Sequence, residues 1–251
     1  MLENSKVITV NVRPLLMIEA EGVLVGLPEA GLPDYETIVK YLCRPDEDAT
    51  IQGIIARYQE VSKIASQLFA VPIEEKIFLK LIWPLKHAVG SYMIGNYLGT
   101  IALCGLVVEM ATMLLFEISP IPINDRPLGK DEGKILFGNT FERLGQKRRI
   151  DVLHAYNIIT DDQAKSLNFI RKIRNQYLHF LTQDHKMLAS ETIKVFDATV
   201  SFIVEMIGQG IDSQGRIILN PKILSYLAQQ GLLETRFQVQ AEIDEDDEFE
   251  E

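Results

Sequence analysis

Apolar residues recur at a helical spacing along most of this chain. Between positions 51 and 69 they fall close to every 3.6 residues, which predicts a helix with one buried face. A second helical region is expected from Glu74 to about Glu117, kinked at Pro84, and a third from about Asn139 to Tyr156. The proline-rich segment 119–127 cannot continue a helix, so a loop is expected there.

A capping box marks the start of the next helix. Thr160 and Gln163 stand three positions apart, so each side chain can reach the other residue's backbone amide. This spacing predicts a helix from residue 161 to about residue 181. Similar signals predict three later elements: a helix over about 190–207 ended by Gly208, a short strand over 216–219, and a helix begun by Asn220-Pro221.

The sequence therefore predicts a mostly α fold, built around a helical bundle at residues 50–210. Residues 1–49 contain β-branched residues in partial alternation and then several glycines and prolines, which predicts a small mixed α/β appendage. Residues 211–241 are expected to form a C-terminal segment with one short helix. Residues 242–251 carry eight acidic residues and no basic one, so a disordered acidic tail is expected.

Charge and cysteine content narrow the class of protein. The net charge is −10, but the tail holds eight of the acidic residues, so residues 1–241 carry only −2. Cys43 and Cys104 stand far apart and predict neither a disulfide framework nor a zinc site, which favours a cytoplasmic protein. The first residues lack the basic start and apolar run of a secretory signal, so none is expected. No histidine has metal-ligand spacing and no glycine-rich phosphate loop follows a strand, so neither metal nor cofactor is expected.

Residues 88–108 contain no charged side chain and are about long enough to cross a bilayer. Four glycines, Ser91 and Asn96 lower the hydrophobicity of this stretch, and Glu109 follows it directly within the same helical pattern. A helix that is apolar on all sides is also typical of the centre of a bundle. A buried core helix is therefore favoured over a transmembrane one, and no membrane association is expected.

The most specific chemical pattern is Arg174-Asn175-x-x-x-His179, within the helix expected at 161–181. A step of about 100° per residue puts Asn175 and His179 together on the polar side of that helix. Arg174 falls at the edge of the apolar face, where a charge needs a partner or a path to solvent. Glu109 is the partner predicted for it. The apolar face itself is predicted to hold Leu167, Ile170, Ile173, Tyr177, Leu178 and Leu181.

This motif resembles that of the HEPN superfamily, in which an arginine and a polar residue precede a histidine on a late helix of an α-bundle. The similarity extends more loosely over residues 140–205 and is nearest to the mannitol operon repressor-like group. The resemblance implies metal-independent RNA cleavage, in which a ribose 2′-hydroxyl attacks its own phosphodiester. His179 would move a proton, Arg174 would stabilise the phosphorane, and Asn175 would orient the phosphate or the histidine. A homodimer is implied as well, because sites in that family form at a two-fold interface.

Two functions remain open. The first is a ribonuclease of the toxin–antitoxin kind, with Arg171 and Lys172 as substrate-binding residues in a locally basic stretch where RNA could dock. The second is a non-catalytic regulatory or protein-interaction module of the repressor type, such as a transcriptional regulator. In that case Arg174 pairs with Glu109 and the motif only holds helices or a dimer together. An antitoxin or a regulatory protein is the partner expected beyond a second copy of the chain.

Overall fold

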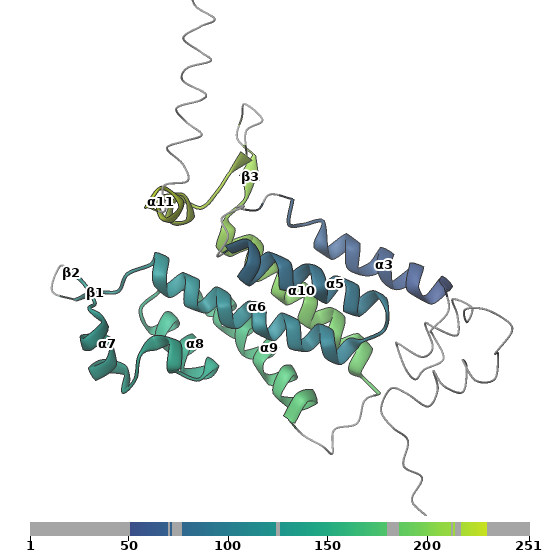
Figure 1. Cartoon of the computed structure of the whole chain (residues 1–251), viewed down its shortest axis with the longest axis horizontal. Coiled ribbons are helices and arrows are strands. Elements are labelled where there is room, and N and C mark those ends of the chain that lie inside the picture. The colour runs from purple at the N-terminus through teal and green to yellow at the C-terminus, as the bar shows by residue number, and fades with distance from the viewer. Residues whose placement is uncertain are drawn as a thin grey trace, which may run out of the picture.

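Helices make up most of the described part of the chain, which confirms the mostly α fold class (Figure 1). The computed structural model describes residues 51–69, 71, 77–123, 126–179, 186–211, 213 and 217–229. The predicted appendage at 1–49 and the predicted tail at 242–251 lie outside these residues. The described elements are α3 (Ile51–Ala65), the π-helical turn η1 (Phe78–Ile82), α5 (Trp83–Met93), α6 (Tyr97–Ile118), β1 (Pro122–Ile123), β2 (Arg126–Pro127), α7 (Lys130–Phe137), the 3₁₀ turn η2 (Phe141–Arg143), α8 (Gln146–Ala155), α9 (Asp161–His179), α10 (Leu188–Ile207), β3 (Gly210–Ile211), β4 (Ile217–Ile218) and α11 (Pro221–Gln229).

Helix α6 is the centre of the bundle. It packs against α5, α9 and α10 and also contacts α8 and α11. Figure 1 shows α6 running alongside α5 and α10, with α3 beyond them and α7 and α8 on the other side. Because neighbours surround it, α6 buries residues on nearly every side, which explains its almost uniform apolar composition. Its fully buried positions include Thr100, Ile101, Cys104, Val107 and Ala111.

The same helix carries the apolar stretch that raises the membrane alternative. Among the described residues, α6 is the one helix long and apolar enough to span a bilayer, and half of its most apolar window is buried inside the protein. A core helix passes the same test of length and composition. The packing of α6 against α5, α9 and α10 supports the buried core helix that the sequence favours.

The long helix predicted from Glu74 to Glu117 is divided in the structure. The chain turns between α5 and α6, where Gly95 adopts a φ of 79°, a conformation that favours glycine. Asn96 then caps α6, since its side-chain oxygen accepts a hydrogen bond from the Gly99 amide at 2.9 Å. Pro84 lies in the first turn of α5, directly after the π-helical turn η1, which runs into that helix. The expected helical region is therefore interrupted at Gly95-Asn96, which ends one helix and starts the next.

The region between α6 and α8 also differs from the prediction. The expected loop at 119–127 contains a short antiparallel pair, with Pro122 opposite Pro127 and Ile123 opposite Arg126. Helix α7, which the sequence pattern did not reveal, ends at Gly138 with a φ of 76°. The helix expected from Asn139 begins only at Gln146, because η2 and an extended Gly145 occupy the intervening segment.

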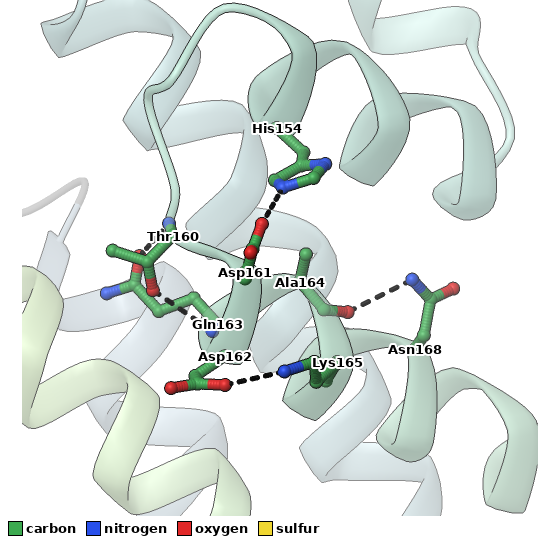
Figure 2. A network of polar contacts seen from close by, with 8 residues as sticks. All are labelled: His154, Thr160, Asp161, Asp162, Gln163, Ala164, Lys165 and Asn168. Atoms are coloured by element: carbon green, nitrogen blue, oxygen red, sulfur yellow. Dashed lines mark hydrogen bonds and ion pairs between the residues drawn. The ribbon is translucent and has the colours of Figure 1, made fainter.

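The capping box at the start of α9 is confirmed. The Thr160 amide donates to Gln163 Oε1 at 3.0 Å, and the Gln163 amide donates to Thr160 Oγ1 at 3.2 Å (Figure 2). Helix α9 then runs as Asp161–His179, and residues 180–185 lie outside the described part. This reciprocal pair satisfies two amides that the helix itself cannot bond, so it sets the position of the whole motif helix.

The last elements agree with the sequence pattern. Helix α10 ends at Gly208, which has a φ of 63°. Strand β4 falls within the short strand expected at 216–219 and pairs in antiparallel fashion with β3. Asn220 precedes α11 and its side-chain oxygen accepts from the Lys222 amide at 2.9 Å, as expected of an N-cap. Helix α11 contacts α6, so this helix rests on the bundle.

Candidate functional site

Arg174 lies across the surface of α6 and is held there by an acidic residue. One guanidinium nitrogen donates to the Glu109 carboxylate, and the two side chains are only 26% and 25% exposed. The stem of Arg174 passes directly over Gly105, where a Cβ atom would collide with the Arg174 Cδ. Gly105 and Glu109 stand four positions apart and so share one face of α6. They form a slot that fixes the guanidinium, because the glycine leaves room for the stem and the carboxylate pairs the charge.

An open groove of about 570 Å³ lies beside this ion pair. From α9, Arg174 and Asn175 line it together with Arg171, which stands one turn earlier on the same helix. Two of the predicted catalytic residues and one predicted substrate-binding residue therefore share one concave surface. The rest of its lining is Glu109 from α6 and Gly145, Gln146, Lys147, Arg148 and Asp151 from the start of α8.

A second open groove, of about 700 Å³, continues along the same two helices toward the start of α9. It shares Lys147, Asp151 and Arg171 with the first, so the two form one trough, here called the α8–α9 groove. Lys172, the other predicted substrate-binding residue, lines this second part. The remaining lining residues are His154, Asp161, Ala164, Lys165, Asn168 and Phe169.

Positive charge exceeds negative charge along the α8–α9 groove. Its cationic side chains are Lys147, Arg148, Lys165, Arg171, Lys172 and Arg174, and its carboxylates are Glu109, Asp151 and Asp161. Lys147 forms an ion pair with Asp151, with 3.1 Å between the ammonium nitrogen and a carboxylate oxygen. Arg171 donates to the Asn168 side chain at 3.3 Å, and neither Arg148 nor Lys172 pairs with a carboxylate of the described residues. A concave surface with an excess of unpaired cations attracts anions.

His179 lies apart from the groove. It is the last residue of α9, its side chain is exposed, and it lines neither part of the α8–α9 groove. Figure 1 shows this end of α9 protruding from the bundle. One chain therefore brings Arg174 and Asn175 together in the groove and leaves His179 outside it.

One position of the predicted apolar face is wrong. Leu178 is 36% exposed, although the adjacent Tyr177 is buried and its hydroxyl donates to Glu191 of α10. Leu181 lies outside the described residues. The other predicted positions of that face are buried: Leu167, Ile170, Ile173 and Tyr177.

Two residues of this site were missed by sequence reasoning. The apolar pattern of α6 does not mark Gly105, although its spacing of four from Glu109 is a usable signal for a slot on one helix face. Gln146 was hidden because the helix was expected to begin at Asn139. Both polar atoms of its side-chain amide are buried and have no hydrogen-bond partner, and the residue lines the groove.

The described residues offer little other chemistry. Cys104 is fully buried in α6, and burial raises the pKa of its thiol to about 12, so it is not a thiolate at neutral pH. Within the described ranges, no group of three or more His, Cys, Asp or Glu side chains could hold a metal ion. His154 is exposed and contacts Asp161 at 2.6 Å (Figure 2), and His87 is exposed beside the Trp83 ring. His185 lies outside the described residues.

Known proteins add nothing to this picture: no protein-family model, no curated protein and no solved structure matches the chain. Its class is therefore defined by its own fold and site. It is a mostly α protein with a cationic groove between α8 and α9 and an arginine fixed at the wall of that groove.

Proposed function

We propose that this protein is a HEPN-like, metal-independent endoribonuclease that acts as a homodimer in the cytoplasm. The observation that supports this function is the placement of Arg174 and Asn175 in one cationic groove. RNA is a polyanion, and Lys and Arg side chains that neutralise its phosphates provide most of the binding free energy in such contacts. The type of reaction is inferred from the motif that ends in His179, because this motif resembles the HEPN pattern.

In the proposed reaction the ribose 2′-hydroxyl attacks the adjacent phosphorus. His179 accepts the hydroxyl proton, the bond from phosphorus to the 5′ oxygen breaks, and that oxygen takes a proton from water. The products are a 2′,3′-cyclic phosphate and a 5′-hydroxyl end. Arg174 stabilises the additional negative charge on the phosphorane, and the Asn175 amide donates to a phosphate oxygen.

Glu109 positions Arg174 without using all of its donors. A guanidinium carries several N–H groups in a planar fork, and within the described residues Arg174 has one hydrogen bond, to Glu109. The remaining N–H groups are available to a phosphate at the wall of the groove. A guanidinium that is already held in place loses little conformational freedom when it binds its substrate.

A second copy of the chain would complete the site. His179 and Leu178 lie exposed at the protruding end of α9. Burial of an exposed leucine favours association, which supports an interface at this end. Pairing there would bring His179 of the partner subunit toward the groove that Arg174 and Asn175 line.

Cleavage of RNA in the presence of EDTA tests this function. The purified full chain should convert mixed RNA into fragments with 2′,3′-cyclic phosphate ends, and His179→Ala should abolish them. His87→Ala is the matched control, because it removes an exposed histidine from α5, away from the motif helix. Loss of activity in both variants, or retention in both, would contradict the role proposed for His179.

The ion pair itself favours a second function, a non-catalytic regulatory or protein-interaction module. Glu109 neutralises Arg174, and His179 lies outside the groove, so the motif can serve to join helices or two chains. An antitoxin or a regulatory protein would then be the partner. The dimer forms under both functions, as size-exclusion chromatography with multi-angle light scattering would measure. Under the second function the dimer leaves RNA intact, so the cleavage assay separates the two.

A further inference from the structure

A histidine and a carboxylate meet across the second part of the α8–α9 groove. His154 Nε2, in the last turn of α8, lies 2.6 Å from Asp161 Oδ1, in the first turn of α9 (Figure 2). Both residues line the groove, and the His154 side chain is 45% exposed. The second ring nitrogen, Nδ1, has no hydrogen-bond partner among the described residues. A ligand in the groove can therefore reach this nitrogen.

The Asp161 carboxylate fixes the orientation of the imidazole. The hydrogen bond from His154, and then its charge, lower the pKa of the Asp161 carboxyl, so this group is ionised at neutral pH and accepts from Nε2. With Nε2 bonded, Nδ1 is the nitrogen that can exchange a proton with a ligand. A carboxylate that holds a histidine in one orientation is a common arrangement for proton transfer, because the second nitrogen is then kept in a fixed place.

Arg171 can bring a phosphate within reach of His154. Its Nε donates to the Asn168 side chain at 3.3 Å, so the head of the arginine lies beside Asn168. Asn168 and Asp161 are seven residues apart on one side of α9, which separates them by about 10 Å along the helix axis. Two hydrogen bonds of about 3 Å each, joined by a phosphate group, bridge most of this separation. One phosphodiester can therefore contact the Arg171 guanidinium and the His154 imidazole together.

The proposed cleavage reaction needs a proton donor as well as a base. His179 takes the proton of the 2′-hydroxyl, and the 5′ oxygen must gain a proton as it leaves, because an alkoxide is a strong base. Near neutral pH, lysine and arginine side chains keep their protons and carboxylates have already lost theirs. Histidine exchanges protons in this range, and His154 is the one histidine among the described residues that line the groove.

We infer that His154 is a second catalytic residue, the general acid that protonates the leaving 5′ oxygen. The 2′ oxygen forms its bond to phosphorus while His179 accepts its proton. As the bond from phosphorus to the 5′ oxygen breaks, His154 donates its Nδ1 proton to that oxygen, and both histidines regain their first protonation state by exchange with water. Asp161 is a positioning residue. The inference rests on the proposed function, and it gives His154 the step otherwise left to water.

A sulfur leaving group tests this role separately from binding. The substrates are two pools of short DNA strands of random sequence, each with one central ribonucleotide. In one pool an ordinary phosphodiester follows the ribonucleotide, and in the other its bridging 5′ oxygen is replaced by sulfur. Both pools carry the same 2′-hydroxyl and the same charge. A thiolate is a much weaker base than an alkoxide, so the sulfur leaves without a general acid.

Single-turnover cleavage rates are measured with the full chain in EDTA at saturating protein. His154→Ala should slow cleavage of the oxygen substrate by about 100-fold or more and that of the sulfur substrate by less than about threefold. Asp161→Asn should show the same dependence on the leaving group with a smaller loss. His179→Ala should slow both substrates, because the 2′-hydroxyl must still lose its proton. The control is His87→Ala, which removes an exposed histidine that lines neither part of the groove and should cleave both substrates as the wild type does.

Two results would overturn the role of His154 alone. An equal loss on both substrates in His154→Ala would show that the residue only binds RNA or supports the two helices, and no loss on either would show that the reaction does not use it. In both cases, cleavage by the wild type and its loss in His179→Ala would leave the ribonuclease intact. Cleavage of neither substrate by the wild type would reject the ribonuclease and this role together.

Discussion

Arg174 rests on Gly105 so closely that a single methyl group on α6 would occupy the space of the arginine Cδ. One turn further along the same face, Glu109 accepts a hydrogen bond from the guanidinium. Because Gly105 has no side chain, the aliphatic stem of Arg174 can pass over it. The Glu109 carboxylate then fixes the position of the guanidinium. The position of Arg174 at the wall of the groove thus depends on two residues of α6, which lies far from α9 in the sequence.

Substitution of Gly105 by alanine tests the slot. The added methyl group should displace Arg174 and lower the free energy of unfolding by about 1 kcal/mol, because overpacking outweighs the gain in helix propensity. Gly90→Ala is the control: Gly90 is an exposed glycine in α5 with nothing within 4 Å of its would-be Cβ. That variant should raise the free energy of unfolding by about 0.5–1 kcal/mol. Urea denaturation measures both, and stabilisation by Gly105→Ala would show that the arginine is not confined there.

The ion pair between Glu109 and Arg174 should be stronger than a surface pair. Both side chains are about a quarter exposed, so solvent screens them less than it screens Lys147 and Asp151, which are 68% and 55% exposed. A double-mutant cycle with Glu109→Gln and Arg174→Gln should give a coupling energy of about 1–2 kcal/mol. The same cycle with Lys147→Gln and Asp151→Asn should give about 0.3–0.5 kcal/mol. Equal couplings would contradict the shielded position of Arg174.

The sequence predicts well the features that depend on local chemistry. The capping box at Thr160, the end of α10 at Gly208 and the N-cap at Asn220 each rest on one or two side chains acting on the nearby backbone, and the structure has all three. The pairing of Arg174 with Glu109 followed from a different rule. A charge at the edge of an apolar face needs a partner, and the apolar helix before it offered few.

The features that depend on a turn or on a distant helix were predicted poorly. The turn at Gly95-Asn96 separates α5 from α6. The sequence pattern does not show it, because apolar residues continue at a helical spacing on both sides of the turn. Helix α7 has few apolar residues to reveal it. The groove depends on the distance and the angle between α8 and α9. The spacing of apolar residues within one helix does not determine either quantity. Leu178 shows the same limit: the helical period places it on the apolar face, but whether a neighbouring helix covers it depends on the packing of the bundle.

The capping box at Thr160 should hold the motif helix in place. Thr160→Ala removes the acceptor for the Gln163 amide and should lower the free energy of unfolding by about 1 kcal/mol. Thr160→Ser keeps the hydroxyl and should lose much less. Urea denaturation of the two variants distinguishes the hydrogen bond from the packing of the threonine methyl group, and an equal loss in both would assign the effect to the methyl group.

The contact between His154 and Asp161 should appear as a pH effect at the mouth of the α8–α9 groove. His154 Nε2 lies 2.6 Å from Asp161 Oδ1, and the contact joins the last turn of α8 to the first turn of α9 (Figure 2). The hydrogen bond from His154, and then its charge, lower the pKa of the Asp161 carboxyl. A carboxyl whose pKa is lower in the folded state binds fewer protons there than in the unfolded chain. Its stabilising contribution is therefore complete above the ordinary carboxyl pKa and is lost as the pH falls through the lowered value.

Titration of the Asp161 carboxyl by NMR checks this directly. His154→Ala should raise the pKa of Asp161 back toward its ordinary value, because both the donor and the positive charge are removed. His87→Ala, which removes an exposed histidine that pairs with no carboxylate of the described residues, should leave the pKa of Asp161 unchanged. Since both partners of the contact are largely exposed, added salt should shrink the difference between wild type and His154→Ala. An unchanged pKa in His154→Ala would show that the first turn of α9, and not the histidine, sets the charge state of Asp161.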